Sequence, residues 1–509
     1  MTLVEARPSI VATRAGKLRG AIVDDIHVFR GVPYAAPPFG ARHLAAPAPA
    51  VPWSGVRDAL VDGAKPPQPT MPAFADQPWD RAPVGADCLN MNIWTPDPGA
   101  RGLPVMIWIT GGSFRAGSNA WYDGSRFARD GVVCVAINYR SGPEGFLYVQ
   151  DGTPNRGLLD QIAAMEWVRD NIASFGGDAG NVTLCGESAG AMCIGVLLAV
   201  PRAKGLFRRA IMQSGAASFA VTADAARRIG ERFAEKLGVA ATQDALATVA
   251  PDALIATHFA LDADVMARPD PAHWGVSMAG AMLTQPVIDG EIVPSAPLER
   301  IRAGAAGGVD VIVGSNLDDW RLFLAFTGDL PKITEEQITG PLARHGANTF
   351  AAYGLPLERA LAAYRSMYPG ASPGDLLAAI QTDWWIRVPA LRLADAHVGP
   401  TSRTFMYEFA WRSPVGDGLF GSCHALEIPF VFDTLDEGPG QMLGDLLGPE
   451  PPRQLATEMH AAWARFIAHG DAGWPEYDVP RRATMRFRTP SIVVDDPRSR
   501  ERALWEGVR

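Results

Sequence analysis

Residues 181–200 read Asn-Val-Thr-Leu-Cys-Gly-Glu-Ser-Ala-Gly-Ala-Met-Cys-Ile-Gly-Val-Leu-Leu-Ala-Val, and the order of residue types in this stretch decides the fold. Residues 181–185 are typical of a short buried strand, and residues 191–200 are typical of an apolar helix. Between them, residues 186–190 form a Gly-x-Ser-x-Gly turn. In such a turn the two glycines allow the serine to take a strained, positive φ and to present its hydroxyl to a cleft. The stretch therefore predicts a nucleophilic side chain at Ser188.

The sequence on both sides predicts further buried strands, each an apolar or β-branched run bounded by glycine or proline. They are expected at residues 89–94, 105–109, 131–138, 210–213, 309–313 and 404–411. Helices are expected at residues 157–175, where the apolar spacing ends at two glycines, and at residues 458–469. This pattern predicts one α/β domain over residues 1–509. Two Ala-rich or helical stretches, at about 222–282 and 322–420, are expected to be cap insertions over the sheet.

The composition excludes several classes of function. The chain has 509 residues, of which 48% are hydrophobic, and this is enough for large buried cores. A formal net charge of −9 argues against a surface for nucleic acid or for anionic membranes. No apolar run approaches the roughly 18 residues of a transmembrane helix, so we expect no membrane span. The partner is therefore expected to be a small molecule, with the chain a monomer or a homodimer.

Cysteine usage and the N-terminal residues indicate a cytoplasmic protein. Residues 1–8 include an acid and a proline where a signal peptide has an apolar run. The chain has 5 cysteines, a small and odd number that suits a reducing compartment. No Cys-x-x-Cys, His-Glu-x-x-His or Walker motif occurs, so we expect neither a metal nor a nucleotide cofactor.

A serine nucleophile needs a base that takes its proton, and five histidines follow residue 319. His345, His397 and His469 lie near the ends of helical stretches, where the helix dipole favours histidine, and His460 lies within a helix. His424 differs, because it follows the turn Gly421-Ser422-Cys423 and precedes the apolar run 428–432. His424 is therefore the candidate base, and a buried structural histidine is the alternative.

The acid that orients the base is expected after a strand and before the base in the chain. Asp318 and Asp319 both follow the strand predicted at 309–313, and one of them is expected to cap a helix or to stay in a solvated loop. Donors for an oxyanion are expected in Thr110-Gly111-Gly112-Ser113-Phe114, directly after another strand. Glu187 and Phe114 are candidate pocket residues, although Glu187 is equally a candidate for a buried structural carboxylate.

Several longer motifs resemble the type-B carboxylesterase family, which includes para-nitrobenzyl esterases, mammalian carboxylesterases and cholinesterases. The resemblance covers nearly the whole chain. It includes residues 29–34, 87–94, 138–140, 157–178, 213–215, 286–290 and 424–430, together with the serine turn. It implies an α/β-hydrolase fold with a large, mostly parallel central sheet and helical cap insertions. It also implies Ser188 as nucleophile, His424 as base, and the N–H groups of Gly112, Ser113 and Ala189 as oxyanion donors.

The chain departs from the family pattern at three places. Relatives usually have a triad glutamate in a pattern like Asp-Glu-Gly, whereas this chain has Asp318-Asp319-Trp320, which places the shorter Asp319 at the acid position. The oxyanion segment has Thr110 where relatives often have histidine, and Ser113 where they have glycine or alanine. Secreted relatives form a disulfide that would pair Cys88 with a cysteine near Pro66, and that cysteine is missing here, so we expect five free thiols.

The sequence thus predicts a serine carboxylesterase that works through an acyl-enzyme intermediate. An amidase, a carbamate hydrolase or a toxin-ester hydrolase of the same fold is one alternative. A non-catalytic, neuroligin-like interaction protein is the other. That branch is expected to lose the serine and to be secreted, whereas this chain retains Ser188.

Overall fold

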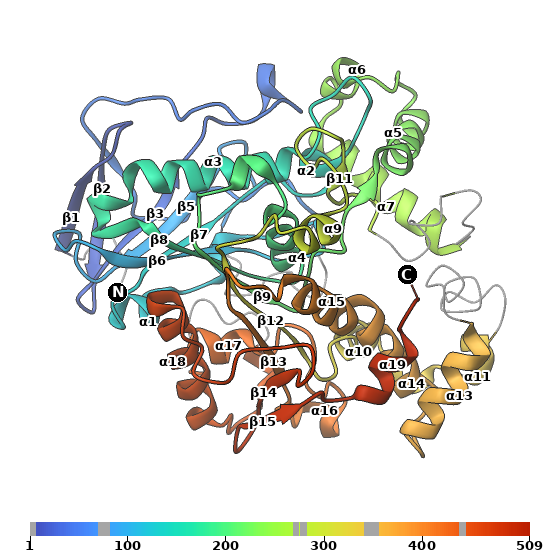
Figure 1. Cartoon of the computed structure of the whole chain (residues 1–509). Coiled ribbons are helices and arrows are strands. Elements are labelled where there is room, and N and C mark those ends of the chain that lie inside the picture. The colour runs from blue at the N-terminus through green and yellow to red at the C-terminus, as the bar shows by residue number, and fades with distance from the viewer. Residues whose placement is uncertain are drawn as a thin grey trace.

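The strands predicted around the serine turn lie side by side in one large mixed sheet (Figure 1). The structure is a computed structural model that describes residues 7–69, 82–267, 274, 282–339, 356–436 and 444–508. Within these residues the sheet has 13 strands, in the order β1-β2-β3-β5-β7-β6-β8-β9-β12-β13-β14-β15, with β4 beside β2. The pairs from β7 across to β14 are parallel, as is the pair of β4 with β2, and the remaining pairs towards both edges are antiparallel. The expected large, mostly parallel sheet is confirmed.

The strands have the following bounds: β1 Arg7–Ala12, β2 Lys17–Val23, β3 Ile26–Pro33, β4 Val56–Asp58, β5 Asn90–Thr95, β6 Leu103–Ile109, β7 Val133–Ile137, β8 Gly177–Glu187, β9 Arg209–Gln213, β10 Val221–Thr222, β11 Val287–Ile288, β12 Asp310–Asn316, β13 Thr404–Phe409, β14 Ala483–Phe487 and β15 Ile492–Asp495. All six strands expected from sequence are present, with ends shifted by a few residues. The strand before Ser188 is longer than expected, because β8 begins at Gly177 and runs to Glu187.

The helices of four or more residues are α1 Ser125–Arg129, α2 Gly142–Phe146, α3 Arg156–Asn171, α4 Ala189–Leu197, α5 Ala223–Leu237, α6 Gln243–Ala247, α7 Pro251–Ala267, α9 Pro297–Arg302, α10 Arg321–Phe326, α11 Glu335–Thr339, α13 Leu357–Met367, α14 Pro373–Thr382, α15 Val388–His397, α16 Val415–Gly418, α17 Ile428–Val431, α18 Arg453–His469 and α19 Ser499–Leu504, with the short 3₁₀ turn η5 at Ile172–Phe175 and the π turn η9 at Asp383–Arg387. Other 3₁₀ turns are η2 Gly40–Arg42, η4 Asn119–Trp121, η6 Pro201–Ala203, η8 Leu330–Lys332 and η10 Gly444–Leu446. Helix α4 starts two residues before the expected position, at Ala189, directly after Ser188.

Helices cover both faces of the sheet, which explains why its central strands are continuous apolar runs. In β6, Val105, Ile107 and Ile109 belong to one buried cluster together with α3 and α4. Met106 and Trp108, which alternate with them, belong to a second cluster with α1, α17 and α18. Figure 1 shows α3 on one side of the sheet and α18 on the other.

The two expected cap stretches are largely helical in their described parts. Residues 222–282 contain α5, α6 and α7, which share a buried cluster of their own. Residues 322–420 contain α10 through α16, but also β13, which is a strand of the main sheet. No helix within the described residues is long and apolar enough to cross a membrane.

The register of the parallel strands places their carboxyl ends at one edge. Ile109 of β6 pairs with Gly186 of β8, Glu187 of β8 pairs with Gln213 of β9, and Gln213 pairs with Gly314 of β12. The residues that follow these strands therefore meet. The carboxyl edge of a parallel sheet is where α/β proteins bind their ligands.

Candidate active site

Ser188 lies between β8 and α4 in the strained conformation expected from its motif. Its φ is 55° and its ψ is −126°. Its N–H donates to the carbonyl oxygen of Gln213 at 2.9 Å, which fixes the turn to β9. A Cβ atom at Gly190 would lie 2.0 Å from the carbonyl oxygen of Ile109, and one at Gly186 would lie 2.8 Å from it. Both glycines are therefore needed for the turn to approach β6.

His424 is buried and bonded to one of the two candidate acids. Its Nδ1 lies 2.7 Å from Oδ1 of Asp319. The other carboxylate oxygen of Asp319 accepts the N–H of Asn316 at 2.8 Å, and the N–H of His424 donates to the carbonyl oxygen of Asp319 at 3.1 Å. The Asp319 side chain is fully buried. It is thus held in one orientation toward the imidazole.

Asp318 faces away from His424. Its Oδ2 accepts the N–H of Ser422 at 3.0 Å and lies 3.3 Å from the guanidinium of Arg412. These contacts close the loop that carries His424 onto the loop after β12. Of the two acids left open by the sequence, only Asp319 contacts the imidazole.

The segment after β6 forms a tight loop against Ser188. Gly112, Ser113 and Phe114 all have positive φ, at 114°, 55° and 55°. A Cβ atom at Gly111 would lie 3.0 Å from Cβ of Ser188, so the backbone touches the serine turn. Ala189 begins α4, and the first N–H groups of a helix have no acceptor within that helix. The N–H groups of Gly112, Ser113 and Ala189 therefore belong to segments that adjoin Ser188.

Glu187 places a second carboxylate beside His424. Its side chain is 3% exposed, and its Oε1 lies 3.0 Å from Nε2 of His424. Burial alone would lower the pKa of His424, but the charge of Glu187 and the hydrogen bond between the imidazole and Asp319 outweigh burial, so that pKa is well above 6.5. Glu187 is thus both buried and electrostatically coupled to His424.

Phe114 follows the tight loop and is completely buried. Its ring packs edge-on against Phe146, with ring centroids 5.2 Å apart. Its place in a substrate pocket stays a prediction.

Glu427 was not predicted as a site residue, although it lies in the same motif as His424. It is fully buried, and its two oxygens accept from Nε2 of Gln213 at 3.0 Å and from Nδ2 of Asn316 at 2.6 Å. Burial and the nearby Glu187 raise the pKa of Glu427 to about 7. The position in the motif was the only available signal, because the contacts join residues far apart in the chain.

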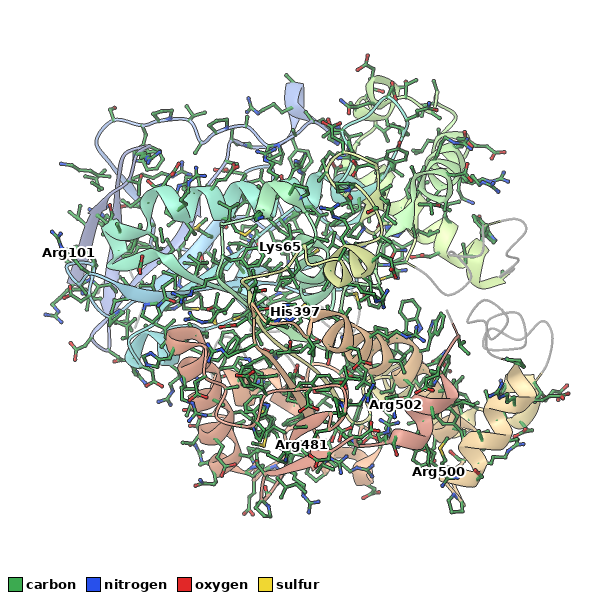
Figure 2. All side chains as sticks on the ribbon, viewed as in Figure 1. Lys65, Arg101, His397, Arg481, Arg500 and Arg502 are labelled. Atoms are coloured by element: carbon green, nitrogen blue, oxygen red, sulfur yellow. The ribbon has the colours of Figure 1, made fainter. Side chains whose placement is uncertain are left out.

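The other described histidines have structural contacts. His397, labelled in the interior in Figure 2, ends α15 and is 2.8 Å from the hydroxyl of Thr404. His460 lies within α18 and faces the carbonyl oxygen of Val431 at 2.7 Å, while His469 is the last residue of that helix. Their predicted helical positions are confirmed. His345 lies outside the described residues.

All five cysteines are unpaired and buried. Burial raises the pKa of each of their thiols, including that of Cys423 beside the base. Within the described ranges, no group of three or more His, Cys, Asp or Glu side chains could hold a metal ion.

Comparison with known proteins shows the family of the chain. A family model described as "Carboxylesterase family" matches residues 7–502. The chain belongs to the carboxylesterase family. The para-nitrobenzyl esterase of Bacillus subtilis is 35% identical, with 97% of each chain covered. Phenmedipham hydrolase of Pseudarthrobacter oxydans is 34% identical over 95% of this chain and 94% of its own.

Solved structures of carboxylesterases have the same fold. The carboxylesterase EST55 of Geobacillus stearothermophilus superposes with a TM-score of 0.81 at 35% identity, over 97% of this chain and 99% of that one. A para-nitrobenzyl esterase superposes with a TM-score of 0.83 at 33% identity, again over 97% and 99%. This carboxylesterase thus has the α/β-hydrolase fold and is a carboxylic ester hydrolase.

Proposed function

We propose that Ser188, His424 and Asp319 form the catalytic triad of this carboxylesterase. The observation that carries the proposal is the 2.7 Å contact between His424 and Asp319, on a histidine that also contacts the residue next to Ser188. Oε1 of Glu187 is 3.0 Å from Nε2 of His424, so Nε2 faces the serine turn while Nδ1 faces the acid. This orientation suits a base whose Nδ1–H donates to Asp319 while its Nε2 accepts the serine proton.

In the proposed reaction, Nε2 of His424 takes the proton of Ser188 as Oγ attacks the ester carbonyl. The imidazolium formed is stabilised by Asp319 and Glu187 on its two sides. It then donates its proton to the leaving alcohol as the bond between the acyl carbon and the alcohol oxygen breaks. Water, deprotonated by the same nitrogen, releases the acid and restores Ser188.

The oxyanion of each tetrahedral intermediate is proposed to accept from the N–H groups of Gly112, Ser113 and Ala189. Backbone donors keep their position whatever side chain they carry, so serine at position 113 is compatible with this role. The helix dipole of α4 adds positive potential at Ala189.

Replacement of the nucleophile tests the proposal. Ser188→Ala is expected to lower kcat on a short-chain aryl ester by about 10⁵-fold or more, with an unchanged fold, because the substitution removes a single oxygen. An organophosphate is expected to label the parent enzyme stoichiometrically at Ser188 and to leave the variant unlabelled. Turnover by the alanine variant at the parent rate would end the proposal.

A carbamate is the second substrate class to test. One relative is named for hydrolysis of phenmedipham, and another, 34% identical over 92% of this chain, is named fumonisin B1 esterase. A panel of aryl esters, amides and aryl carbamates, measured with the same titrated enzyme, separates these classes by kcat/KM. We expect carboxylic esters to be the preferred class.

We also propose a cytoplasmic location on the basis of the five buried thiols, and separately that the chain is a monomer or a homodimer. Alkylation of the denatured protein without prior reduction, followed by mass spectrometry, is expected to modify all five cysteines. Three or fewer alkylations would reveal a disulfide and remove the basis for this location. Light scattering after gel filtration determines the oligomeric state.

A further inference from the structure

A buried histidine and a buried glutamate form a pair at helix α2, outside the proposed triad. Nε2 of His43 lies 2.9 Å and 3.0 Å from the two carboxylate oxygens of Glu144. Nδ1 of the same ring lies 2.8 Å from the carbonyl oxygen of Ala247. The side chains of His43 and Glu144 are 7% and 1% exposed. Each nitrogen of the imidazole therefore faces an oxygen atom in the interior.

These two contacts need a proton between the imidazole and the carboxylate. Carbonyl and carboxylate oxygens only accept, so His43 makes both hydrogen bonds only when both of its nitrogens carry a proton. A proton on Glu144 gives the same count, because the acid then donates to Nε2. Without that proton, the lone pair of Nε2 faces a buried carboxylate, and within the described residues no other group donates to its oxygens. The contact thus depends on one proton.

The position of His43 is fixed between α2 and the first cap stretch. His43 directly follows the turn η2, and its N–H donates to the carbonyl oxygen of Gly40 at 3.0 Å. The next residue, Leu44, belongs to the buried cluster that α5, α6 and α7 share. Ala247, which faces Nδ1, is the last residue of α6. The imidazole therefore cannot turn away from Glu144 without breaking its contact with the cap.

Helix α2, which carries Glu144, contacts the proposed oxyanion segment at both of its ends. At its first residue, the N–H of Gly142 donates to the carbonyl oxygen of Phe114. At its last residue, the ring of Phe146 packs edge-on against the ring of Phe114, with centroids 5.2 Å apart. Glu144 lies between these two contacts, and Phe114 directly follows Ser113. A displacement of Glu144 is therefore transmitted to the backbone at Ser113.

Charged and titratable residues come close to the pair from each element around it. They are Arg42 of η2, Arg140 after β7, Arg156 and Asp160 of α3, Asp244 of α6 and His258 of α7. Burial and the charge of Arg115 lower the pKa of His258 to about 3, so His258 stays neutral. Of the two histidines near α2, His43 is thus the one that titrates near neutral pH.

We propose that the pair of His43 and Glu144 positions the oxyanion donor at Ser113, and that loss of the shared proton lowers kcat as pH rises. The inference rests on the proposed function, in which the N–H of Ser113 is such a donor. Burial lowers the pKa of His43, but its hydrogen bond to Glu144, the charge of Glu144 and the hydrogen bond to Ala247 raise that pKa above 6.5 overall. His43 and Glu144 are positioning residues, since they act through α2.

The test compares the pH dependence of kcat in the parent enzyme, His43→Gln and His43→Arg. An amide and a guanidinium both donate to Glu144 at every pH from 6 to 10, so neither variant loses the contact. The substrate is 4-nitrophenyl acetate, and active sites are counted by organophosphate titration. His424 titrates in all three enzymes, so its ionisation cancels in the ratio of the variant kcat to the parent kcat.

We expect this ratio to rise about tenfold with pH for both variants, with little change in KM, because misplaced oxyanion donors weaken binding of the transition state and not of the ester. Glu144→Gln is expected to give the same rise, since its amide accepts from a protonated Nε2 and donates to a bare one. It also replaces any His43 variant that does not fold.

His460→Gln is the matched control. Nδ1 of His460 lies 2.7 Å from the carbonyl oxygen of Val431, and its Nε2 lies 3.1 Å from a carboxylate oxygen of Asp130, so the ring has the same two kinds of acceptor as His43. It belongs to α18, whose apolar residues pack on the face of the sheet opposite Phe146. The ratio for this variant is expected to be constant with pH.

A ratio that is constant with pH in folded His43→Gln, His43→Arg and Glu144→Gln enzymes would overturn the proposal, and would assign any loss of kcat at high pH to another group such as Arg156. An equal rise in His460→Gln, or a pH-dependent change in KM in place of kcat, would overturn it as well. Failure of the proposed function is a different outcome, because it appears as turnover by Ser188→Ala at the parent rate.

Discussion

Two neighbouring aspartates after β12 have opposite surroundings, and this difference gives the first prediction. Asp319→Asn keeps the shape of the side chain but removes the charge that stabilises the imidazolium of His424, so kcat is expected to fall by about 10²–10⁴-fold. Asp318→Asn is the matched control. Asp318 does not contact the imidazole, so its substitution is expected to change kcat far less. Steady-state kinetics of both variants on one aryl ester measures the two values of kcat. If Asp318→Asn shows the large loss and Asp319→Asn the small one, the acid is Asp318.

The pH dependence of activity depends on the two carboxylates that flank His424. Because they hold its pKa well above 6.5, kcat/KM is expected to rise with pH through an ionisation at a higher pH than that of a free imidazole. Glu187→Gln removes one of the two charges, so the pKa of His424 falls and the acid limb of the profile moves to lower pH. A profile of kcat/KM from pH 5 to 10 measures this shift. An acid limb at the same pH in both enzymes would show that Glu187 does not act on the base.

At the scale of elements, helix α7 of the first cap stretch contacts the loop that carries the proposed oxyanion donors Gly112 and Ser113. Arg115 follows that loop, and its Nη2 lies 2.8 Å from Oδ2 of Asp262, whose side chain is 9% exposed. The N–H of Arg115 donates to the carbonyl oxygen of Gly112 at 2.9 Å. A displacement of α7 is therefore transmitted to the backbone at Gly112.

Asp262→Asn tests this connection. Loss of the charge leaves Arg115 without its partner near the site, and we expect a lower Tm and a reduction of kcat by roughly tenfold with a smaller change in KM. Asp264→Asn is the control on the same helix, because Asp264 pairs with Lys236 at the surface and is 50% exposed. If both variants lower kcat equally, the effect comes from the helix as a whole and the specific connection is refuted.

At the scale of the whole molecule, buried Glu427 makes stability depend on pH. A carboxyl group with a folded pKa of about 7 and an ordinary pKa of 4.5 stabilises the folded state fully below pH 4.5, and this contribution is lost as pH rises to about 7. Glu427→Gln has no such proton to lose. Thermal melts between pH 4.5 and 7 are therefore expected to show a smaller decrease of Tm with pH in the variant than in the parent. An equal or larger decrease would contradict the raised pKa.

The parts of the site that depend on local sequence could be predicted, and the parts that depend on long-range packing could not. Ser188 and the loop at Gly112 lie in short motifs next to strands, so their conformations follow from glycines and apolar periodicity. The choice between Asp318 and Asp319 could not follow from spacing alone. It is determined by the N–H of Ser422, more than 100 residues away, which holds Asp318.

Long-range packing also explains why some residues of the site were not predicted from the sequence. Glu427 becomes part of the site because Gln213 and Asn316, on separate strands, converge on it. Trp320 and Trp385 stack on each other although they are far apart in the chain, and no sequence spacing indicates that contact. Phe114 has a positive φ of 55°, and the sequence does not show which residues of a glycine-containing loop adopt such a φ.

The final described segment of the chain has a consequence for protein engineering. Arg498 reaches Asp383 beneath the π turn, and the indole N–H of Trp505 donates to the hydroxyl of Tyr364 at 2.9 Å in the same cluster. These residues follow the last strand of the sheet and are remote from Ser188 in sequence. Randomising positions 498–508 in a directed-evolution library would therefore vary the contacts that hold the π turn Asp383–Arg387, and the thermal stability of each variant measures that effect.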